Sequence, residues 1–133
     1  MPITVNDIKV ITFPNQENRK AQLSIYDTDS SVPFDIKRVF CINSREKLKR
    51  GDHAHKECLQ ILICLSGAIK VICDDKKRKK EFLLDSSHKG LLVPAMIWAT
   101  QDYIESSSIL MVLCSHSYNE EDYIRDYQRF LKC

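Results

Sequence analysis

The sequence predicts an all-β domain: a closed barrel of short strands, followed by one amphipathic α-helix at the C-terminal end. Two observations support this fold class. Short runs rich in valine, isoleucine, leucine and aromatic residues recur along the chain, separated by polar residues or glycine. The apolar spacing becomes helical only after residue 118. A chain of 133 residues is long enough for one core and too short for two, so residues 1–133 are predicted to form a single domain.

The predicted strands are short, and turn-forming residues connect several of them. The turn at Ser66-Gly67 and the basic segment 74–80 are each expected to link neighbouring strands as a hairpin. We interpret the basic segment as a solvated hairpin tip rather than a nuclear address or a phosphate-binding patch. The predicted strands are residues 8–13, 22–26, 36–42, 59–65, 68–73, 81–84, 90–93 and 109–114.

The helix is predicted over residues 119–132 because four apolar residues fall on one helical face there, with acidic residues in the first turn and a basic residue in the last. The residues of this face are Tyr123, Tyr127, Phe130 and Leu131. The predicted helix would cap the barrel.

Composition and charge indicate an ordinary soluble protein. The chain is 44% hydrophobic and 29% charged, and a formal net charge of +2 gives no reason to expect nucleic-acid binding. The six cysteines are scattered without a C-x-x-C pair, as is typical of reduced thiols. The sequence contains neither a signal-like segment nor an apolar run of about 18 residues. We therefore expect a cytoplasmic protein that binds neither nucleic acid nor a membrane.

Two histidines in the segment RGDHAHK, residues 50–56, are the strongest candidates for catalysis. His53 and His55 are two residues apart, so on a strand both would face the barrel interior, where imidazoles can transfer protons near neutral pH. The alternative is that both are structural. The flanking Arg50 and Lys56 would suit an anionic ligand such as a diphosphate, although each alone is more typical of a surface charge.

The same segment resembles the first motif of the cupins. The tripeptide HAH at residues 53–55, Gln60 and Gly67 stand at the spacing of that motif, with glutamine in place of its carboxylate. In the second motif, which begins at Pro94, Ala99 stands where a third metal-binding histidine is expected. The resemblance implies the cupin double-stranded β-helix, a jelly-roll barrel. Because two metal ligands are replaced, we expect no metal and no other cofactor, and Gln60 would orient an imidazole or a ligand instead.

Five segments, spread over nearly the whole chain, carry a closer resemblance: residues 33–40, 50–56, Gln60, 94–98 and 118–131. Together they resemble the small sugar 3,4-ketoisomerases, also called WxcM-like proteins. The resemblance implies a bacterial, metal-free homodimer that exchanges its N-terminal strands. It also implies an isomerase that moves the ketone of dTDP-4-keto-6-deoxy-D-glucose from C4 to C3. A pyridoxal-phosphate-dependent aminotransferase would use the product to make 3-amino-3,6-dideoxyhexoses of surface glycans such as lipopolysaccharide.

The resemblance also implies roles for individual residues. His53 matches the first histidine of the family motif and is expected to remove the C3 proton, which the neighbouring ketone acidifies, and to return a proton to C4 of the enediolate. This work is not expected to need a large shift of its pKa. His55 is expected to stabilise the enediolate or to orient His53. Substrate contacts are expected from Arg50, Lys56, Gln60, Lys20 and Trp98, although Trp98 could equally be a buried barrel aromatic.

Three positions depart from the family pattern. Phe40 stands where relatives commonly have a tyrosine that is a candidate proton shuttle. Lys20 occupies the position associated with product stereochemistry, and it is closer to the arginine of galacto-forming enzymes than to the tyrosine of gluco-forming ones. Its usual partner is replaced by Ala99. The sequence therefore favours the galacto product.

Two other functions stay open. A dTDP-sugar epimerase would use a similar barrel and a histidine base, but commonly with a tyrosine acid on the opposite face. A metal-free cupin that binds a nucleotide sugar as a sensor or assembly module would bind without moving protons.

The N-terminal strand also bears on the oligomeric state. Residues 8–13 form an apolar edge that a monomeric barrel would leave unpaired, which favours a dimer.

Overall fold

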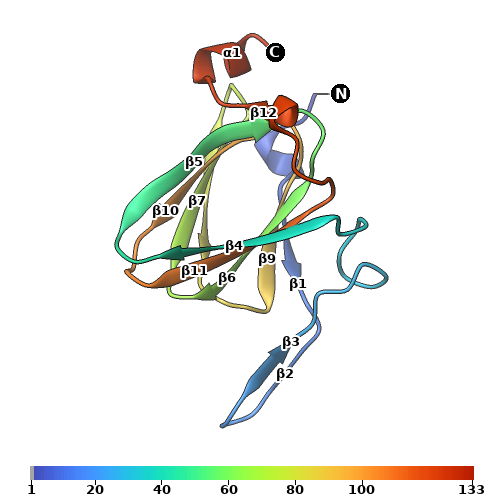
Figure 1. Cartoon of the computed structure of the whole chain (residues 1–133), viewed down its shortest axis with the longest axis vertical. Coiled ribbons are helices and arrows are strands. Elements are labelled where there is room, and N and C mark those ends of the chain that lie inside the picture. The colour runs from blue at the N-terminus through green and yellow to red at the C-terminus, as the bar shows by residue number, and fades with distance from the viewer. Residues whose placement is uncertain (1) are drawn as a thin grey trace.

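The computed structural model describes residues 2–133, which form a barrel of antiparallel strands with a short helix near the C-terminus (Figure 1). Residue 1 of the predicted domain lies outside the described range. The strands are β1 (Lys9–Thr12), β2 (Asn15–Glu17), β3 (Gln22–Ser24), β4 (Arg38–Ser44), β5 (Leu48–His55), β6 (Gln60–Ser66), β7 (Ile69–Asp74), β8 (Lys79–Leu84), β9 (Lys89–Val93), β10 (Trp98–Tyr103), β11 (Ser108–Cys114) and β12 (Tyr123–Ile124). The helices are η1 (Val5–Asp7), η2 (Glu120–Asp122) and α1 (Tyr127–Leu131).

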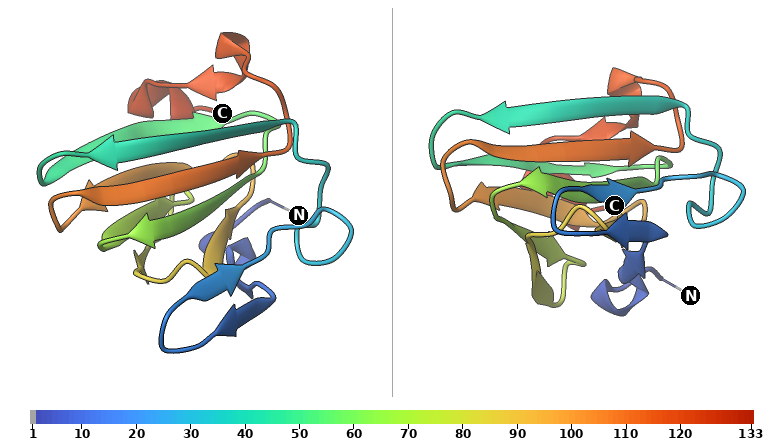
Figure 2. Two further views of the ribbon diagram at one scale, coloured as in Figure 1. Left: turned by 60° about the horizontal axis from the view of Figure 1, so that its bottom comes forward. Right: turned by 90° about the horizontal axis from the view of Figure 1, so that it is seen from below.

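Two five-stranded sheets form the barrel wall. One has the strand order β1-β9-β6-β11-β4 and the other β12-β5-β10-β7-β8. The short β2-β3 hairpin forms a separate sheet that projects from the barrel, as Figures 1 and 2 show from different sides. The all-β barrel with a short C-terminal helix agrees with the fold class predicted from sequence.

The barrel encloses an apolar core because alternate residues of each strand face inward. On β7, Ile69, Val71 and Cys73 are fully buried, as are Leu110 on β11 and Tyr103 on β10. A second cluster lies between the C-terminal segment and the barrel wall, and it consists of Ala54, Trp98, Ile124 and Phe130. The apolar core thus fills the barrel, and the C-terminal segment covers part of the outer surface of the barrel wall.

All eight predicted strands are strands in the structure, with their ends displaced by at most two residues. β2, β5, β10 and β12 were not predicted. β5 and β10 have the sequences LKRGDHAH and WATQDY, whose polar inward positions conceal the apolar alternation that marks a strand. The basic segment 74–80 does join β7 to β8 as a hairpin. The predicted Ser66-Gly67 hairpin is wrong, since β6 and β7 lie in different sheets.

The predicted helix at residues 119–132 is wrong over its first half. Residues 120–122 form a 3-10 turn, residues 123–124 pair with β5, and only Tyr127–Leu131 is α-helical. Asp126 caps this helix by accepting a hydrogen bond from the backbone N–H of Gln128. A short helix is marginal on its own, whereas pairing with the open edge of β5 provides hydrogen bonds for the backbone of β12.

The first predicted strand also differs from expectation. β1 pairs with β9 of the same chain, so the expectation that a monomeric barrel would leave this strand unpaired is wrong. Its outer edge has no strand partner among residues 2–133. Val10 on this strand is 55% exposed. No helix within the described range is long and apolar enough to span a membrane.

Candidate active site

A bulge in β5 determines which side chains this strand sends into the barrel. The strand pairs with β10 in register as far as Gly51, and pairing resumes at His53, which leaves Asp52 as an extra residue. Arg50 faces the interior before the bulge, and His53 and His55 face it afterwards. If residues 50–55 alternated strictly, with no bulge at Asp52, both histidines would face outward.

The backbone at the bulge accounts for the glycine in the RGDHAHK segment. Gly51 and Asp52 have positive φ angles of 91° and 58°. A Cβ atom on residue 51 would lie 2.9 Å from the carbonyl oxygen of Ala99, closer than real Cβ contacts allow. Glycine tolerates both the left-handed backbone and the close approach. The inward orientation of the histidines therefore depends on Gly51.

Two cavities adjoin the histidines. The outer one has a volume of about 270 Å³. The inner one measures about 10 Å³, room for no more than one water molecule. His53, Gln60 and Gln101 line both, whereas His55 lines only the inner one. The remaining outer residues are Arg38, Phe40, Ile42, Arg50, Gly51, Tyr118, Tyr123 and Arg125. A ligand in the outer cavity would therefore meet His53 before His55.

His53 is neutral in the folded protein. Burial, followed by the positive field of His55, lowers its pKa from 6.5 to about 4. The role of a base was not expected to need a large pKa shift, and burial nevertheless produces one here. Its Nδ1 atom is buried without a hydrogen-bond partner among the described residues. A neutral ring with a free nitrogen at the cavity can accept a proton.

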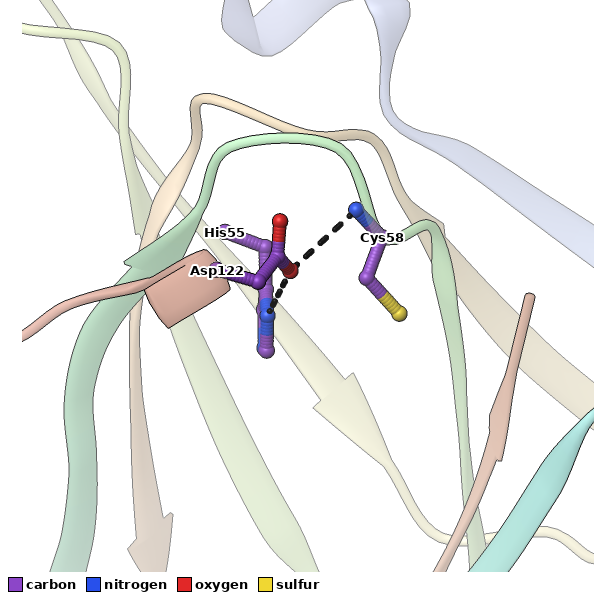
Figure 3. A group of neighbouring side chains, drawn as sticks. All are labelled: His55, Cys58 and Asp122. Carbon is purple, nitrogen blue, oxygen red and sulfur yellow. Dashed lines mark hydrogen bonds and ion pairs between the residues drawn. The ribbon is translucent and has the colours of Figure 1, made fainter. Parts of the chain in front are cut away.

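His55 is held by a carboxylate that the sequence reading did not identify. Its Nδ1 atom lies 2.9 Å from Oδ2 of Asp122, as Figure 3 shows. The hydrogen bond and the charge of His55, together with the backbone N–H of Glu57, lower the pKa of Asp122 against the opposing effect of burial. With Nδ1 bonded to the carboxylate, Nε2 is the free nitrogen of the ring, and it is buried without a partner in the described chain.

His55, Cys58 and Asp122 could in principle hold a metal ion, since one ligand atom from each lies within 4.8 Å of the others. Hydrogen bonding with Cys114 lowers the pKa of Cys58, which would suit a thiolate ligand. The carboxylate, however, already accepts hydrogen bonds from the His55 ring and from the backbone N–H groups of Glu57 and Cys58. In Figure 3 the Cys58 backbone nitrogen, rather than its sulfur, is bonded to Asp122. The group is thus built as a clamp that ties η2 to the loop after β5.

The inner cavity contains the positions at which cupins bind a metal ion. Gln60 and Ala99 line it together with both histidines, so the four motif positions do converge in space. Only the two histidines among them are good metal ligands, because an amide binds hard or borderline cations weakly and alanine offers no donor. These residues therefore fit a resident metal poorly.

The outer cavity is strongly basic, since Arg38, Arg50 and Arg125 all line it. Arg125 is paired with Glu120 at 2.7 Å. Neither Arg38 nor Arg50 has an acidic partner within ion-pair distance in residues 2–133. Arginine forks suit phosphate and oxyanion groups, so the cavity can bind an anionic ligand.

The other residues predicted to contact substrate lie in different places. Gln60 lines both cavities, and Lys56 lines a neighbouring open depression of about 460 Å³ that shares Tyr123 and Arg125 with the outer cavity. Trp98 does not line either cavity beside the histidines: it packs on the outer side of β10 against the C-terminal helix. Lys20 is exposed in the turn of the β2-β3 hairpin, outside the cavities of its own chain.

Several cavity residues were missed because they come from segments that looked structural. Arg38 faces inward on β4 two residues before Phe40, a pattern visible within the predicted strand 36–42. Tyr123 and Arg125 were assigned to a helix, so their approach to β5 had no signal in the local spacing. Asp122 likewise lies 67 residues from its partner His55 in the chain.

The chain is similar to known proteins over nearly its whole length. The family model described as WxcM-like, C-terminal, matches residues 6–133. The chain is 39% identical over 125 residues to the TDP-4-oxo-6-deoxy-alpha-D-glucose-3,4-oxoisomerase of Aneurinibacillus thermoaerophilus, covering 93% of this chain and 90% of that protein.

Two solved structures share the whole fold. QdtA, a sugar 3,4-ketoisomerase from Thermoanaerobacterium thermosaccharolyticum solved in complex with TDP, superposes with a TM-score of 0.92 at 30% identity over 97% of this chain and 95% of that one. A 3,4-ketoisomerase from Helicobacter canadensis superposes with a TM-score of 0.89 at 32% identity, covering 95% and 96% of the two chains.

The barrel, with its inward histidine pair and basic cavity, therefore defines a cupin of the sugar-isomerase class, as the sequence predicted. Within this class the chain belongs to the WxcM-like family of sugar 3,4-ketoisomerases.

Proposed function

We propose that this protein moves the ketone of dTDP-4-keto-6-deoxy-D-glucose from C4 to C3. The observation that carries the proposal is a neutral histidine facing an arginine-lined cavity, in a chain 39% identical to a 3,4-oxoisomerase. The histidine can move a proton and the arginines can hold an anionic sugar nucleotide. Both requirements of the reaction are thus met by residues of one cavity.

The reaction proceeds through an enediolate. The C4 ketone acidifies the C3 proton, and His53 removes it, so that the electrons of the C3–H bond form a C3=C4 double bond and negative charge gathers on O4. A proton then moves from O3 to O4, C3 becomes the ketone, and His53 returns a proton to C4. No electrons leave the sugar. Positioned proton transfer of this kind contributes about 10² to 10⁴-fold to the rate.

His55 supports this chemistry from behind His53. The two rings meet edge to face with their centroids 5.0 Å apart. Asp122 directs Nδ1 of His55 away from the cavity and leaves Nε2 on the side of the inner cavity that His53 also lines. His55 therefore orients His53 and helps to stabilise the charge of the enediolate.

The sugar nucleotide would extend from the outer cavity into the neighbouring depression. Arg38 and Arg50 are placed for the sugar oxygens and the diphosphate, with Gln60 as a neutral donor beside His53. Lys56 lines the adjoining depression, where the rest of the nucleotide would lie. Trp98 supports the wall from outside and would not contact the sugar.

The product and its fate follow from the family resemblance. A 3-ketone can condense with an amine, so a pyridoxal-phosphate-dependent aminotransferase is the expected next enzyme, leading to 3-amino-3,6-dideoxyhexoses of bacterial surface glycans. Lys20 favours the galacto product. The β2-β3 hairpin that carries Lys20 projects away from the barrel of its own chain (Figure 1). Lys20 would therefore act on the site of the partner in a homodimer with exchanged N-terminal strands.

Two variants test the roles of the histidines. His53→Asn should keep TDP binding but lower turnover by about 10²-fold or more, because asparagine cannot accept the C3 proton. His55→Asn should have a milder effect, on the order of 2 to 4 kcal/mol in the barrier at most. Nuclear magnetic resonance of the keto sugar in D₂O would report both conversion and deuterium entry at C3. Near-normal exchange in His53→Asn with none in His55→Asn would reverse the assignment.

The same spectra distinguish the alternatives. A binding module would bind the keto sugar, yet the wild-type protein would neither convert it nor exchange its C3 hydrogen. An epimerase would exchange deuterium and leave the ketone at C4. Movement of the ketone to C3 by the wild-type protein would exclude both.

A further inference from the structure

Tyr123 is the hydroxyl group best placed beside the candidate base. It lies on β12 directly opposite His55, and its ring packs against His53 and His55 with centroid separations of 5.1 and 4.4 Å. It lines the outer cavity together with His53. The phenol and the candidate base therefore face the same space from neighbouring strands.

The hydrogen bonding of this phenol leaves its proton free. Its oxygen accepts a hydrogen bond from Nη1 of Arg38 at 3.1 Å. Arginine can only donate, so the phenol's own proton needs another acceptor, and none is found among residues 2–133. The half-buried Tyr123 thus offers an unused O–H donor at the cavity.

Two guanidinium groups adjoin the phenol. Arg38 is bonded to its oxygen, and the guanidinium carbon of Arg125 lies 4.2 Å from the centre of its ring. Positive charge at these positions would stabilise the negative charge that develops on the phenol oxygen when its proton is given away. The surroundings therefore favour donation of the phenol proton.

The other tyrosine of the cavity is already engaged. Tyr118 donates its proton to Oε1 of Glu120 at 2.7 Å and is 57% exposed. Tyr103, nearby on β10, donates to Gln101 at 2.8 Å. Phe40 lines the cavity but has no hydroxyl. Among the described residues of the cavity, Tyr123 is the hydroxyl with an uncommitted proton.

We propose that Tyr123 carries the proton between the two sugar oxygens during the isomerisation. This inference rests on the proposed function. After His53 has taken the C3 proton, the phenol donates its proton to O4 of the enediolate, and the resulting phenolate takes the proton from O3. The electrons of the O3–H bond form the C3 ketone, the C3=C4 electrons capture a proton at C4 from His53, and Tyr123 regains its starting form.

The test is Tyr123→Phe, which keeps the aromatic ring and removes only the hydroxyl. Turnover should fall by about 10²-fold or more, the scale of lost general acid–base catalysis. Deuterium entry at C3 should fall much less, because His53 is intact, so the ratio of exchange to turnover should rise at least about tenfold. TDP affinity should stay within about a factor of two of the wild type, since the arginines remain.

Tyr127→Phe is the matched control. It removes a phenol from the same C-terminal segment, one bonded to Asp74 at 2.6 Å and outside the cavities beside the histidines, and should leave turnover and exchange unchanged. Turnover of Tyr123→Phe within about threefold of the wild type would overturn the proposal. A parallel fall of exchange, turnover and TDP affinity would do the same, since it would indicate a structural role. Wild-type protein without conversion or exchange would instead refute the proposed function.

Discussion

At the residue scale, the site pairs an imidazole that is free to react with one that is fixed. His53 lies at the cavity, uncharged because burial lowers its pKa to about 4. His55 lies behind it, held by the Asp122 clamp, which also ties down the backbone after β5. An imidazole with a perturbed pKa beside an arginine-lined cavity is a recognised mark of proton-transfer sites.

The lowered pKa of His53 predicts a pH dependence of stability. The folded pKa of about 4 lies below the unfolded value of 6.5, so between these values the unfolded chain binds more protons. Full stability is therefore present above about pH 6.5 and is lost as pH falls toward 4. After a discount for partial exposure, the loss should be on the order of 2 kcal/mol, from about 1.4 kcal/mol per pKa unit.

Urea unfolding at several pH values between 4 and 7 would measure this loss. His53→Asn has no imidazole at this position, so its free energy of unfolding should fall less with acid than that of the wild type. His116→Asn, which replaces an exposed histidine, should follow the wild type. Parallel curves for His53→Asn and the wild type would contradict the prediction.

At the element scale, strand irregularities rather than regular strands build the site. The bulge at Gly51 and Asp52 turns the two histidines inward, and the short pairing of β12 with β5 places Tyr123 against them. Both features lie on β5, where the polar residues of the cavity interrupt the apolar alternation. A strand with strict alternation would have carried either Arg50 or the histidines into the barrel, but not both.

Gly51→Ala should therefore damage activity as well as stability. The new Cβ would meet the Ala99 carbonyl oxygen at 2.9 Å in a left-handed backbone, at a cost of about 1 to 3 kcal/mol. Relief of this strain would displace His53, so turnover of the folded protein should also fall, by about tenfold or more. Urea unfolding and turnover at saturating substrate would measure the two effects.

Gly67→Ala provides a control of the same kind. Gly67 also has a positive φ angle, 81°, and a Cβ there would lie 2.9 Å from the Cα of Ser108, but it is absent from the walls of the histidine cavities. Its replacement should lower stability and leave the turnover of folded protein near normal. Equal losses of turnover in the two variants would show that strain alone, and not the bulge, controls activity.

At the scale of the whole molecule, the barrel leaves apolar surface that a second copy could cover. The β2-β3 hairpin stands away from the barrel wall (Figure 2), and Leu23 on it is 51% exposed. Val10 on the edge strand β1 is also exposed. A projecting hairpin beside an open strand edge is the kind of element that homodimers exchange or pair.

We therefore expect a homodimer in solution. Light scattering at micromolar concentration should give twice the mass of the chain, and Leu23→Glu should shift the protein toward monomer because it places a charge within the expected interface. Leu83→Glu, at a leucine on β8 that is 57% exposed, should remain dimeric. A wild-type monomer, or no difference between the two variants, would argue against the exchanged N-terminal strands.

The sequence by itself determined the barrel and the pair of catalytic candidates. Eight strands were recognisable because their buried residues are apolar and short polar segments separate them. His53, His55 and Gln60 were recognisable because their spacing within one short segment resembles a cupin motif. Trp98 could have been placed outside the barrel by the same logic, since it is next to the inward-facing Ala99 on β10.

Only the tertiary structure decided how the site is completed. Asp122, Tyr123 and Arg125 reach the histidines because the C-terminal segment pairs with the edge of β5 instead of remaining helical. Local periodicity reports the preferences of neighbouring residues, whereas this pairing joins segments more than 60 residues apart. The pKa of His53 was likewise decided by burial and by the nearby His55, because desolvation depends on what surrounds a side chain in space.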